Sequence, residues 1–138
     1  MSGPDPYLFF NGNCAEAMRF YERTLGGKIE MMMTHGQAPA AEKIQGDPNR
    51  ILHARLSLDG RIFMASDAME GHPYEGMHGF SLSLTYATVP EGKKIFTALS
   101  EGGQVRMPFD KTFWVEAFGM CVDRFGTPWM INAGKPAM

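Results

Sequence analysis

The sequence has few cysteines, few histidines and little net charge. It holds 138 residues with two Cys and four His, and 13 basic residues stand against 15 acidic ones. Cys14 and Cys121 are too few for a disulfide framework and form no CxxC pair, so we expect two reduced thiols. No Lys/Arg cluster exceeds a pair, so the chain lacks the positive field that nucleic acid or an anionic membrane requires. We expect neither as a partner.

Long apolar stretches are also absent. No stretch approaches the roughly 20 residues that a membrane span needs. The first six residues, Met-Ser-Gly-Pro-Asp-Pro, lack a basic segment followed by an apolar one. We therefore expect a cytoplasmic protein.

The second half of the chain repeats the pattern of the first. Residues 25–31, Leu-Gly-Gly-Lys-Ile-Glu-Met, correspond to residues 101–107, Glu-Gly-Gly-Gln-Val-Arg-Met, at an offset of 76. Residues 59–64 correspond to residues 125–130 at an offset of 66, so the first copy has ten extra residues, near Gln37–Arg50. Two copies of one small unit are predicted, and two equivalent sheets paired across a pseudo-two-fold axis would leave a cleft for a ligand.

The first copy has the pattern of a βαβββ unit. A short apolar strand over residues 7–10 precedes Asn13 and Glu16, an Asn variant of the capping box that predicts a helix start. The helix should end at Gly26-Gly27, and strands should follow over residues 28–34, 52–58 and 61–66. Asp59-Gly60 predicts a hairpin turn between the last two strands.

The second copy repeats this order. A strand over residues 80–86 leads to Thr88 and Glu91, another capping box, and Gly102-Gly103 should end the helix. Strands over residues 104–109, 113–122 and 128–132 complete the unit. The sequence thus predicts one α+β domain over residues 1–138, with a first module over 6–68, a connector over 69–79 and a second module over 80–133.

Two stretches carry a resemblance to a known family. Residues 14–21, Cys-Ala-Glu-Ala-Met-Arg-Phe-Tyr, lead into Leu-Gly-Gly, and residues 113–132 have the pattern FW-x3-FG-x3-D-x-FG-x2-WM-x-N. Both resemble the vicinal oxygen chelate superfamily, which includes glyoxalase I, extradiol dioxygenases and bleomycin-resistance proteins. Within it, the chain is most similar to the PhnB-like branch, from residue 7 to residue 132. The resemblance implies two βαβββ modules that form a U-shaped cleft, commonly in a homodimer.

The resemblance also implies where a metal would bind. Metal-dependent members place one His or Glu on the first and last strand of each module. On this chain the four positions correspond to Pro6 or Tyr7, Met64, Ser81 or Ser83, and Met130. None offers an imidazole or a carboxylate, and a thioether suits Cu(I) rather than the divalent ions of such chemistry. We therefore expect no metal and no cofactor, although a trio such as His53, His78 and Asp123 stays open.

The other candidate residues each have a second interpretation. His53, Arg55 and Ser57 share one face of a strand, where a cleft, solvent or a dimer contact would suit them equally. His35 ends a strand, and His72 and His78 lie in the connector, where a lid could use them but a solvated loop is favoured. Cys121 is predicted to face the cleft, opposite Met120 and Val122, as an inert thiol because no base is identifiable beside it. By strand parity Trp129 is predicted to be core and Met130 to face the cleft. The ligand cleft is thus predicted to contain Tyr7, Phe9, His53, Arg55, Met64, Ser66, Ser81, Ser83, Cys121 and Met130.

Three functions fit these residues. A metal-independent small-molecule-binding protein is favoured, because the predicted lining is mostly apolar with a few hydroxyls. The alternative is a metal-dependent lyase, isomerase or dioxygenase whose ligands the alignment misplaces, with His53 or His78 among them. A methyltransferase or a phosphonate-pathway accessory is implied only by names attached to the branch, such as 3-demethylubiquinone-9 3-methyltransferase. The chain lacks a strand followed by a Gly-rich turn suited to S-adenosylmethionine.

Overall fold

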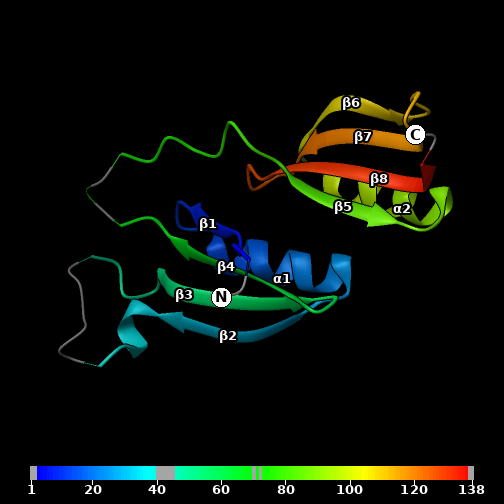
Figure 1. The fold of residues 1–138 in the computed structure, drawn as a ribbon. Coiled ribbons are helices and arrows are strands. Elements are labelled where there is room, and N and C mark those ends of the chain that lie inside the picture. Colours follow the sequence, from blue (N-terminus) through cyan, green and yellow to red (C-terminus); the bar gives the residue numbers. More distant parts are fainter. Residues whose placement is uncertain (1–2, 40–45, 70, 72, 137–138) are drawn as a thin grey trace. The chain divides into compact units, whose positions relative to one another are not determined.

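The protein consists of two compact units, Met1–Gly76 and Met77–Met138. The computed structural model describes residues 3–39, 46–69, 71 and 73–136, so His72 and residues 40–45 of the long loop lie outside the described part. The division between the units falls inside the predicted connector. Among the described residues, each unit contains one α-helix and one four-stranded sheet, which confirms the predicted α+β fold of two βαβββ modules (Figure 1).

The first module forms sheet A, whose strands lie in the order β1-β4-β3-β2. Strand β1 is parallel to β4, and the other pairs are antiparallel. Its elements are β1 (Tyr7–Phe10), α1 (Cys14–Leu25), β2 (Lys28–Thr34), the 3-10 helix η1 (His35–Gln37), β3 (Ile51–Leu58) and β4 (Arg61–Asp67).

The second module forms sheet B with the equivalent order, β5-β8-β7-β6. Again the first and last strands of the module, β5 and β8, are parallel neighbours. Its elements are β5 (Leu82–Tyr86), α2 (Val89–Ser100), β6 (Gln104–Asp110), β7 (Val115–Val122) and β8 (Pro128–Pro136).

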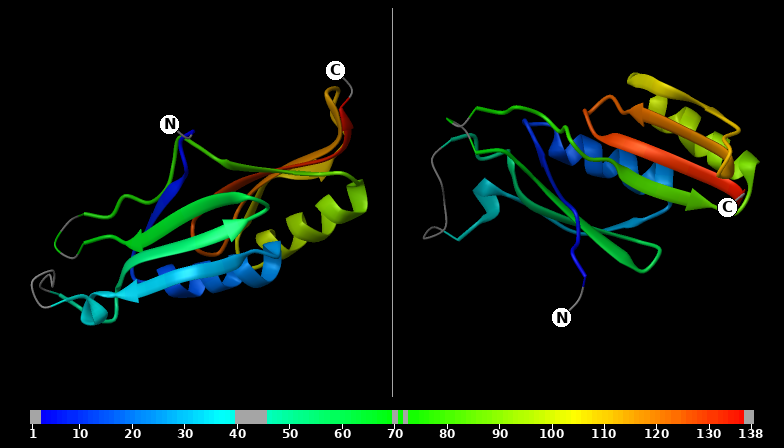
Figure 2. Two further views of the ribbon diagram at one scale, coloured as in Figure 1. Left: turned by 60° about the horizontal axis from the view of Figure 1, so that its bottom comes forward. Right: turned by 45° about the horizontal axis from the view of Figure 1, so that its top comes forward.

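Each helix covers one face of its own sheet, as Figure 2 shows. In the first module, Tyr21 of α1 lies with its ring centre 6.0 Å from that of Phe63 on β4, and both side chains are buried. In the second, Phe96 of α2 is buried where β7 has Gly119, the one residue type that leaves room for the ring. The opposite face of each sheet has no helix of its own module against it. This open face is where the sequence predicts ligand binding.

The start of α1 differs from the prediction. Asn13 occupies the N-cap position but its side chain caps nothing. Instead, the buried Asp67 at the end of β4 accepts hydrogen bonds from the backbone N–H groups of Gly12 and Cys14. A carboxylate 54 residues further along the chain thus replaces the local cap. The start of α2 follows the prediction more closely, because Thr88 accepts from the backbone N–H of Glu91.

Three strand boundaries also differ from the prediction by two residues or more. Strand β5 begins at Leu82, so Ser81 lies before it. Leu82 is the first residue that pairs with β8, and its partner is Trp129. The residue before Trp129 is a proline, which has no N–H group to donate to a longer β5. Strand β7 begins at Val115, because the Val115 N–H is bound to the Thr112 hydroxyl in a turn. Strand β8 continues to Pro136. The predicted Asp59-Gly60 turn is confirmed, since both residues have positive φ, 50° and 76°. No helix among the described residues is long and apolar enough to cross a membrane.

Candidate functional site on the open sheet faces

One cross-strand row on the open face of sheet A runs through all four strands. The register pairs Tyr7 with Met64, Met64 with Arg55, and Arg55 with Met31. Paired residues project from the same side of a sheet, so these four side chains are neighbours on the open face. Their flanking residues Leu8, Ala54 and Ala65 are buried on the helix side.

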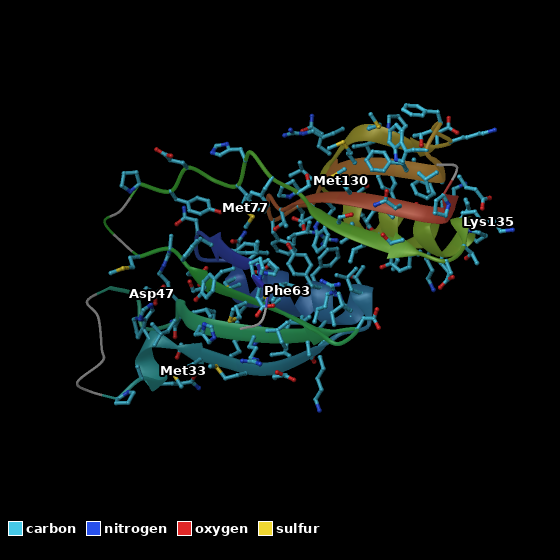
Figure 3. All side chains as sticks on the ribbon, in the orientation of Figure 1. Met33, Asp47, Phe63, Met77, Met130 and Lys135 are labelled. Carbon is cyan, nitrogen blue, oxygen red and sulfur yellow. The ribbon has the colours of Figure 1, made fainter. Side chains whose placement is uncertain are left out.

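The open face of sheet B carries the equivalent row. Here Ser83 pairs with Met130, Met130 with Met120, and Met120 with Met107. Met130 on β8 is marked in Figure 3. The offset of 76 carries Tyr7 onto Ser83 and Met31 onto Met107, and the offset of 66 carries Met64 onto Met130. Three of the four positions in each row thus correspond at the repeat offsets, and the register selects Tyr7 and Ser83 from the alternatives Pro6 or Tyr7 and Ser81 or Ser83.

The side chains at the four positions where the resemblance implies metal ligands are poor ligands for a divalent ion. Tyr7 and Ser83 offer hydroxyl groups, and Met64 and Met130 offer neutral thioethers. A catalytic divalent site needs about three nitrogen or oxygen donors that are deprotonated. Within the described ranges, no three His, Cys, Asp or Glu side chains gather in a group that could hold a metal ion.

The open face of sheet A has a polar corner built on aromatic rings. The Tyr7 hydroxyl lies 3.1 Å from Nδ1 of His53. The Tyr7 ring centre lies 5.1 Å from that of Phe9 and 5.7 Å from the His53 ring. Tyr7 is 38% exposed and Phe9 54% exposed, so these rings present apolar surface to a ligand.

The cation in the row is neutralised by a neighbour. The Arg55 guanidinium donates through Nε to Oε1 of Glu30 at 3.0 Å, and both side chains are nearly half exposed. Such an exposed pair contributes at most about 1 kcal/mol to stability. The ion pair also affects which ligands can bind, because a paired guanidinium attracts anions less than a free one.

Ser66 and Ser81, two of the three serines predicted to line the cleft, do not both lie on the open faces. Ser66 pairs with Phe9 on the open face, as predicted, but is only 6% exposed. Ser81 lies outside β5 and takes no part in the row. The hydroxyl on the open face of sheet B comes instead from Ser83, which accepts a hydrogen bond from the Asn132 amide at 3.1 Å.

The predicted orientation of Cys121 is wrong. Cys121 pairs with Trp129, and both are buried on the helix side of sheet B, whereas Met120 pairs with Met130 on the open face. Burial raises the pKa of the Cys121 thiol, and a hydrogen bond with Ser100 partly opposes this rise. The thiol is thus neutral and shielded from a ligand on the open face. The prediction that Trp129 is a core residue is confirmed.

Cys14 provides a pH-dependent test of the core of the first module. Burial, and secondarily the charge of Asp67, raise the pKa of this thiol from 9.0 to about 12. The unfolded thiol ionises near its ordinary pKa, so above pH 9.0 the folded chain retains a proton that the unfolded chain has lost. We expect the free energy of unfolding to decrease by up to about 1.4 kcal/mol per pH unit in this window.

Urea denaturation of wild type and Cys14→Ala at about pH 8 and about pH 10.5 measures this contribution. The stability of the variant should decrease less steeply with pH, because alanine has no proton to retain. Equal decreases in the two proteins would contradict the raised pKa.

Apart from His53, none of the described histidines belongs to the polar corner on sheet A. The backbone N–H of His35 donates to the Arg50 carbonyl, and His35 begins η1, a turn that the sequence predicted only as loop. His78 is exposed in the connector. His72 lies outside the described residues. Neither His78 nor Asp123 lies in the same unit as His53, and Asp123 is already bound to the backbone of its own turn and to the Trp129 indole.

Several open-face residues were missed from the sequence. They are Glu30, Met31 and Met33 on β2, Met107 on β6 and Met120 on β7. The repeat itself held the signal for two of them, because Met31 and Met107 end the matched segments. Glu30 and Met33 depend on a β-bulge in β2, whose register shift changes which residues face outward. Met120 was missed because its neighbour Cys121 was assigned to the open face of β7.

Comparisons with known proteins agree with this architecture. A family model described as 3-demethylubiquinone-9 3-methyltransferase matches residues 4–132. Protein YjdN of Escherichia coli K12 is 37% identical over 139 aligned positions, which cover 94% of each chain. The crystal structure of protein PA1353 from Pseudomonas aeruginosa is 44% identical, with a TM-score of 0.90 over 97% of this chain and 98% of that one.

More distant structures share the fold. The PhnB protein of Bacillus cereus is 25% identical, with a TM-score of 0.82 over 96% of this chain and 100% of that one. A glyoxylase/bleomycin resistance protein/dioxygenase domain from Frankia is 14% identical, with a TM-score of 0.67 over 98% of this chain and 93% of that one. The likeness to the Frankia domain is evidence for the fold alone.

Proposed function

The chain belongs to the 3-demethylubiquinone-9 3-methyltransferase (PhnB-like) family, and from the chemistry of its open sheet faces we propose that it is a metal-independent small-molecule-binding protein. The observation that carries the proposal is the pair of equivalent rows, with Met64 and Met130 at the two positions where the resemblance implies carboxylate ligands of a metal. A thioether does not replace a carboxylate as a ligand for a hard divalent ion, and the open faces remain able to bind an apolar molecule.

The composition of these faces supports binding of apolar molecules of varied shape. Met31, Met33 and Met64 lie on the open face of sheet A, and Met107, Met120 and Met130 lie on that of sheet B. A methionine side chain is flexible and polarisable, so a surface rich in it adapts to different ligands. The few hydroxyl, amide and imidazole groups would orient a ligand by hydrogen bonds.

The methyltransferase activity in the family's description has no support from the local geometry. An S-adenosylmethionine site of the common kind needs a glycine-rich turn between a strand and a helix. The turn from β1 to α1 contains one glycine, Gly12, and the turn from β5 to α2 contains none. A metal-dependent lyase, isomerase or dioxygenase would require ligands outside the four equivalent positions.

Assembly and location belong to the same proposal. We infer a homodimer in the cytoplasm, with a small molecule and a second copy of the chain as its partners. The exposed outer strands β2 and β6 support this inference, because unpaired strand edges favour association with another chain. The U-shaped cleft between the modules also remains a prediction.

Native mass spectrometry of untagged, unchelated protein tests the proposal as a whole. We expect the mass of a dimer, a retained small molecule in part of the sample, and less than about a tenth of an equivalent of Mn, Fe, Co, Ni or Zn. Adding these ions should not raise the melting temperature, since a tightly bound metal stabilises by several kcal/mol. A stoichiometric divalent metal would instead support the enzyme, and a monomeric mass would contradict the dimer.

Substitutions at the two equivalent methionines test the binding faces. We expect Met64→Glu and Met130→Glu to change stability by less than about 1 kcal/mol, because a half-buried open-face carboxylate stays solvated, and to weaken binding of apolar ligands. The matched controls are Ala65→Glu and Ile131→Glu, one residue further on, at fully buried positions. These should not fold. Thermal melts followed by circular dichroism make the comparison, and unfolded Met64→Glu and Met130→Glu proteins would contradict the assignment of the faces.

A further inference from the structure

Tyr7 and His53 form a hydrogen-bonded pair that crosses a strand. Strand β4 lies between β1 and β3, so the tyrosine on β1 must extend over β4 to reach the histidine on β3. Two strands separated by a third lie about 10 Å apart, a span that the long tyrosine side chain covers. The contact joins the Tyr7 hydroxyl to Nδ1 of His53 at 3.1 Å. It holds the imidazole in one place beside the aromatic rings of Tyr7 and Phe9.

This contact also sets which nitrogen of His53 a ligand would meet. Nδ1 is occupied by Tyr7, and the His53 side chain makes no other hydrogen bond among the described residues. A neutral imidazole carries one N–H and one lone pair. When the Tyr7 hydroxyl donates to the lone pair of Nδ1, the proton resides on Nε2. The outward nitrogen is then a hydrogen-bond donor.

The surroundings of the pair favour a flat, uncharged ligand. Tyr7 and Phe9 offer partly exposed rings whose centres are 5.1 Å apart, and Met33 is the register partner of His53 on β2. Aromatic rings and thioethers bind the faces of other aromatic rings well. The nearest cation in the row, Arg55, is paired with Glu30, so the surface offers little attraction for a free anion.

We propose that this corner of sheet A binds a neutral planar aromatic molecule that carries a hydrogen-bond acceptor at its ring edge, such as a heteroaromatic nitrogen or a ring carbonyl. The ring lies against Tyr7 and Phe9, and the acceptor receives the Nε2–H of His53. Tyr7 acts as a positioning residue, because it holds the tautomer and the orientation of the imidazole. This inference rests on the proposed binding function and specifies the class of ligand.

Quinoline and naphthalene are suitable probes, because they share one shape and differ by a single ring nitrogen. Their affinities can be measured by NMR titration of 15N-labelled wild type and variants, and the spectra also report whether each variant is folded. The His53→Phe variant keeps a ring but removes the donor. We expect it to weaken quinoline binding about tenfold, the effect of losing roughly one hydrogen bond, and to change naphthalene binding less than about threefold.

Two further variants separate positioning from general packing. Tyr7→Phe keeps the ring and removes the hydroxyl, so quinoline affinity should decrease by about threefold while naphthalene affinity stays constant. The 15N shifts of His53 should move towards a mixture of tautomers, which a purely structural role for Tyr7 would not cause. Tyr86→Phe removes the same hydroxyl group on the helix side of sheet B, where Tyr86 pairs with the buried Ala133, and should leave the quinoline affinity and these shifts unaltered.

The possible outcomes distinguish this inference from the proposed function. Equal losses for both probes in His53→Phe, or tighter wild-type binding of the edge donor indole than of quinoline, would overturn the acceptor assignment while leaving apolar binding intact. Failure of wild type to bind either probe would also overturn it. The broader binding function would then be decided by the retained ligand and the two Met→Glu variants.

Discussion

Replacing Asp67 with alanine is expected to lower the free energy of unfolding by about 3–5 kcal/mol, because one buried carboxylate serves three backbone donors. Asp67 is 4% exposed. Oδ1 accepts from Gly12 at 2.8 Å and from Cys14 at 3.0 Å, and Oδ2 accepts from Ile51 at 2.8 Å. Alanine would leave all three donors without this acceptor, at the start of α1 and the start of β3 together.

Urea denaturation measures the loss, and two variants calibrate it. Asp67→Asn keeps one acceptor oxygen but turns an N–H group towards a backbone donor, so it should cost about 2 kcal/mol. Asp110→Ala is the matched control, because Asp110 is exposed and accepts only from the backbone of Lys111. It should change stability by less than about 0.5 kcal/mol. A loss below about 1 kcal/mol for Asp67→Ala would mean that water replaces the carboxylate.

The second large effect is expected where α2 approaches sheet B most closely. A Cβ at Gly92 would lie 2.5 Å from the Cβ of Ala133 and 3.2 Å from Cζ of Phe109. Gly92→Ala should therefore destabilise by about 2 kcal/mol, the cost of overpacking less the helix propensity that alanine adds. The same measurement of urea denaturation applies.

A second substitution tests whether the contact with Ala133 is the cause. Ala133→Gly removes the opposing methyl group, so the double variant should be more stable than the sum of the single effects by at least about 1 kcal/mol. Additive effects would show that Gly92→Ala acts through Phe109 or through the helix itself. This cycle measures how closely the helix must pack for the second module to form.

The core of the first module could be predicted from periodicity, but the cap of its helix could not. Cys14, Ala17, Met18, Tyr21 and Leu25 fall at helical spacing on one face of α1; the first four are buried and Leu25 is partly exposed. Asn13 and Glu16 suggested a local cap, yet Asp67 accepts the hydrogen bonds instead. A short sequence motif shows only that a local side chain could accept a hydrogen bond from the start of the helix. The hydrogen bond forms with the acceptor that the fold brings nearest and shields from water.

On the open faces, too, some positions could be predicted from the sequence and others could not. Met64 and Met130 could be placed from the repeat offset, because duplicated modules keep equivalent positions in register. The strand register was needed to choose Tyr7 over Pro6 and Ser83 over Ser81. Cys121 was assigned to the wrong face. Its strand, β7, alternates regularly, but nothing in the residues 115–122 indicates which alternate set faces the helix until Trp129 is paired with Cys121.

The sequence alone established the duplication, the α+β class, the hairpin at Asp59-Gly60 and the absence of carboxylates at Met64 and Met130. Each of these depends on residues close in the chain or on a fixed offset between the two copies. The folded chain was needed to establish that Tyr7 reaches His53 across β4, that Arg55 is paired with Glu30, and that Asp67 holds the start of α1. These contacts join residues 25 to 55 positions apart. Their geometry depends on strand order and register, which pattern and composition do not specify.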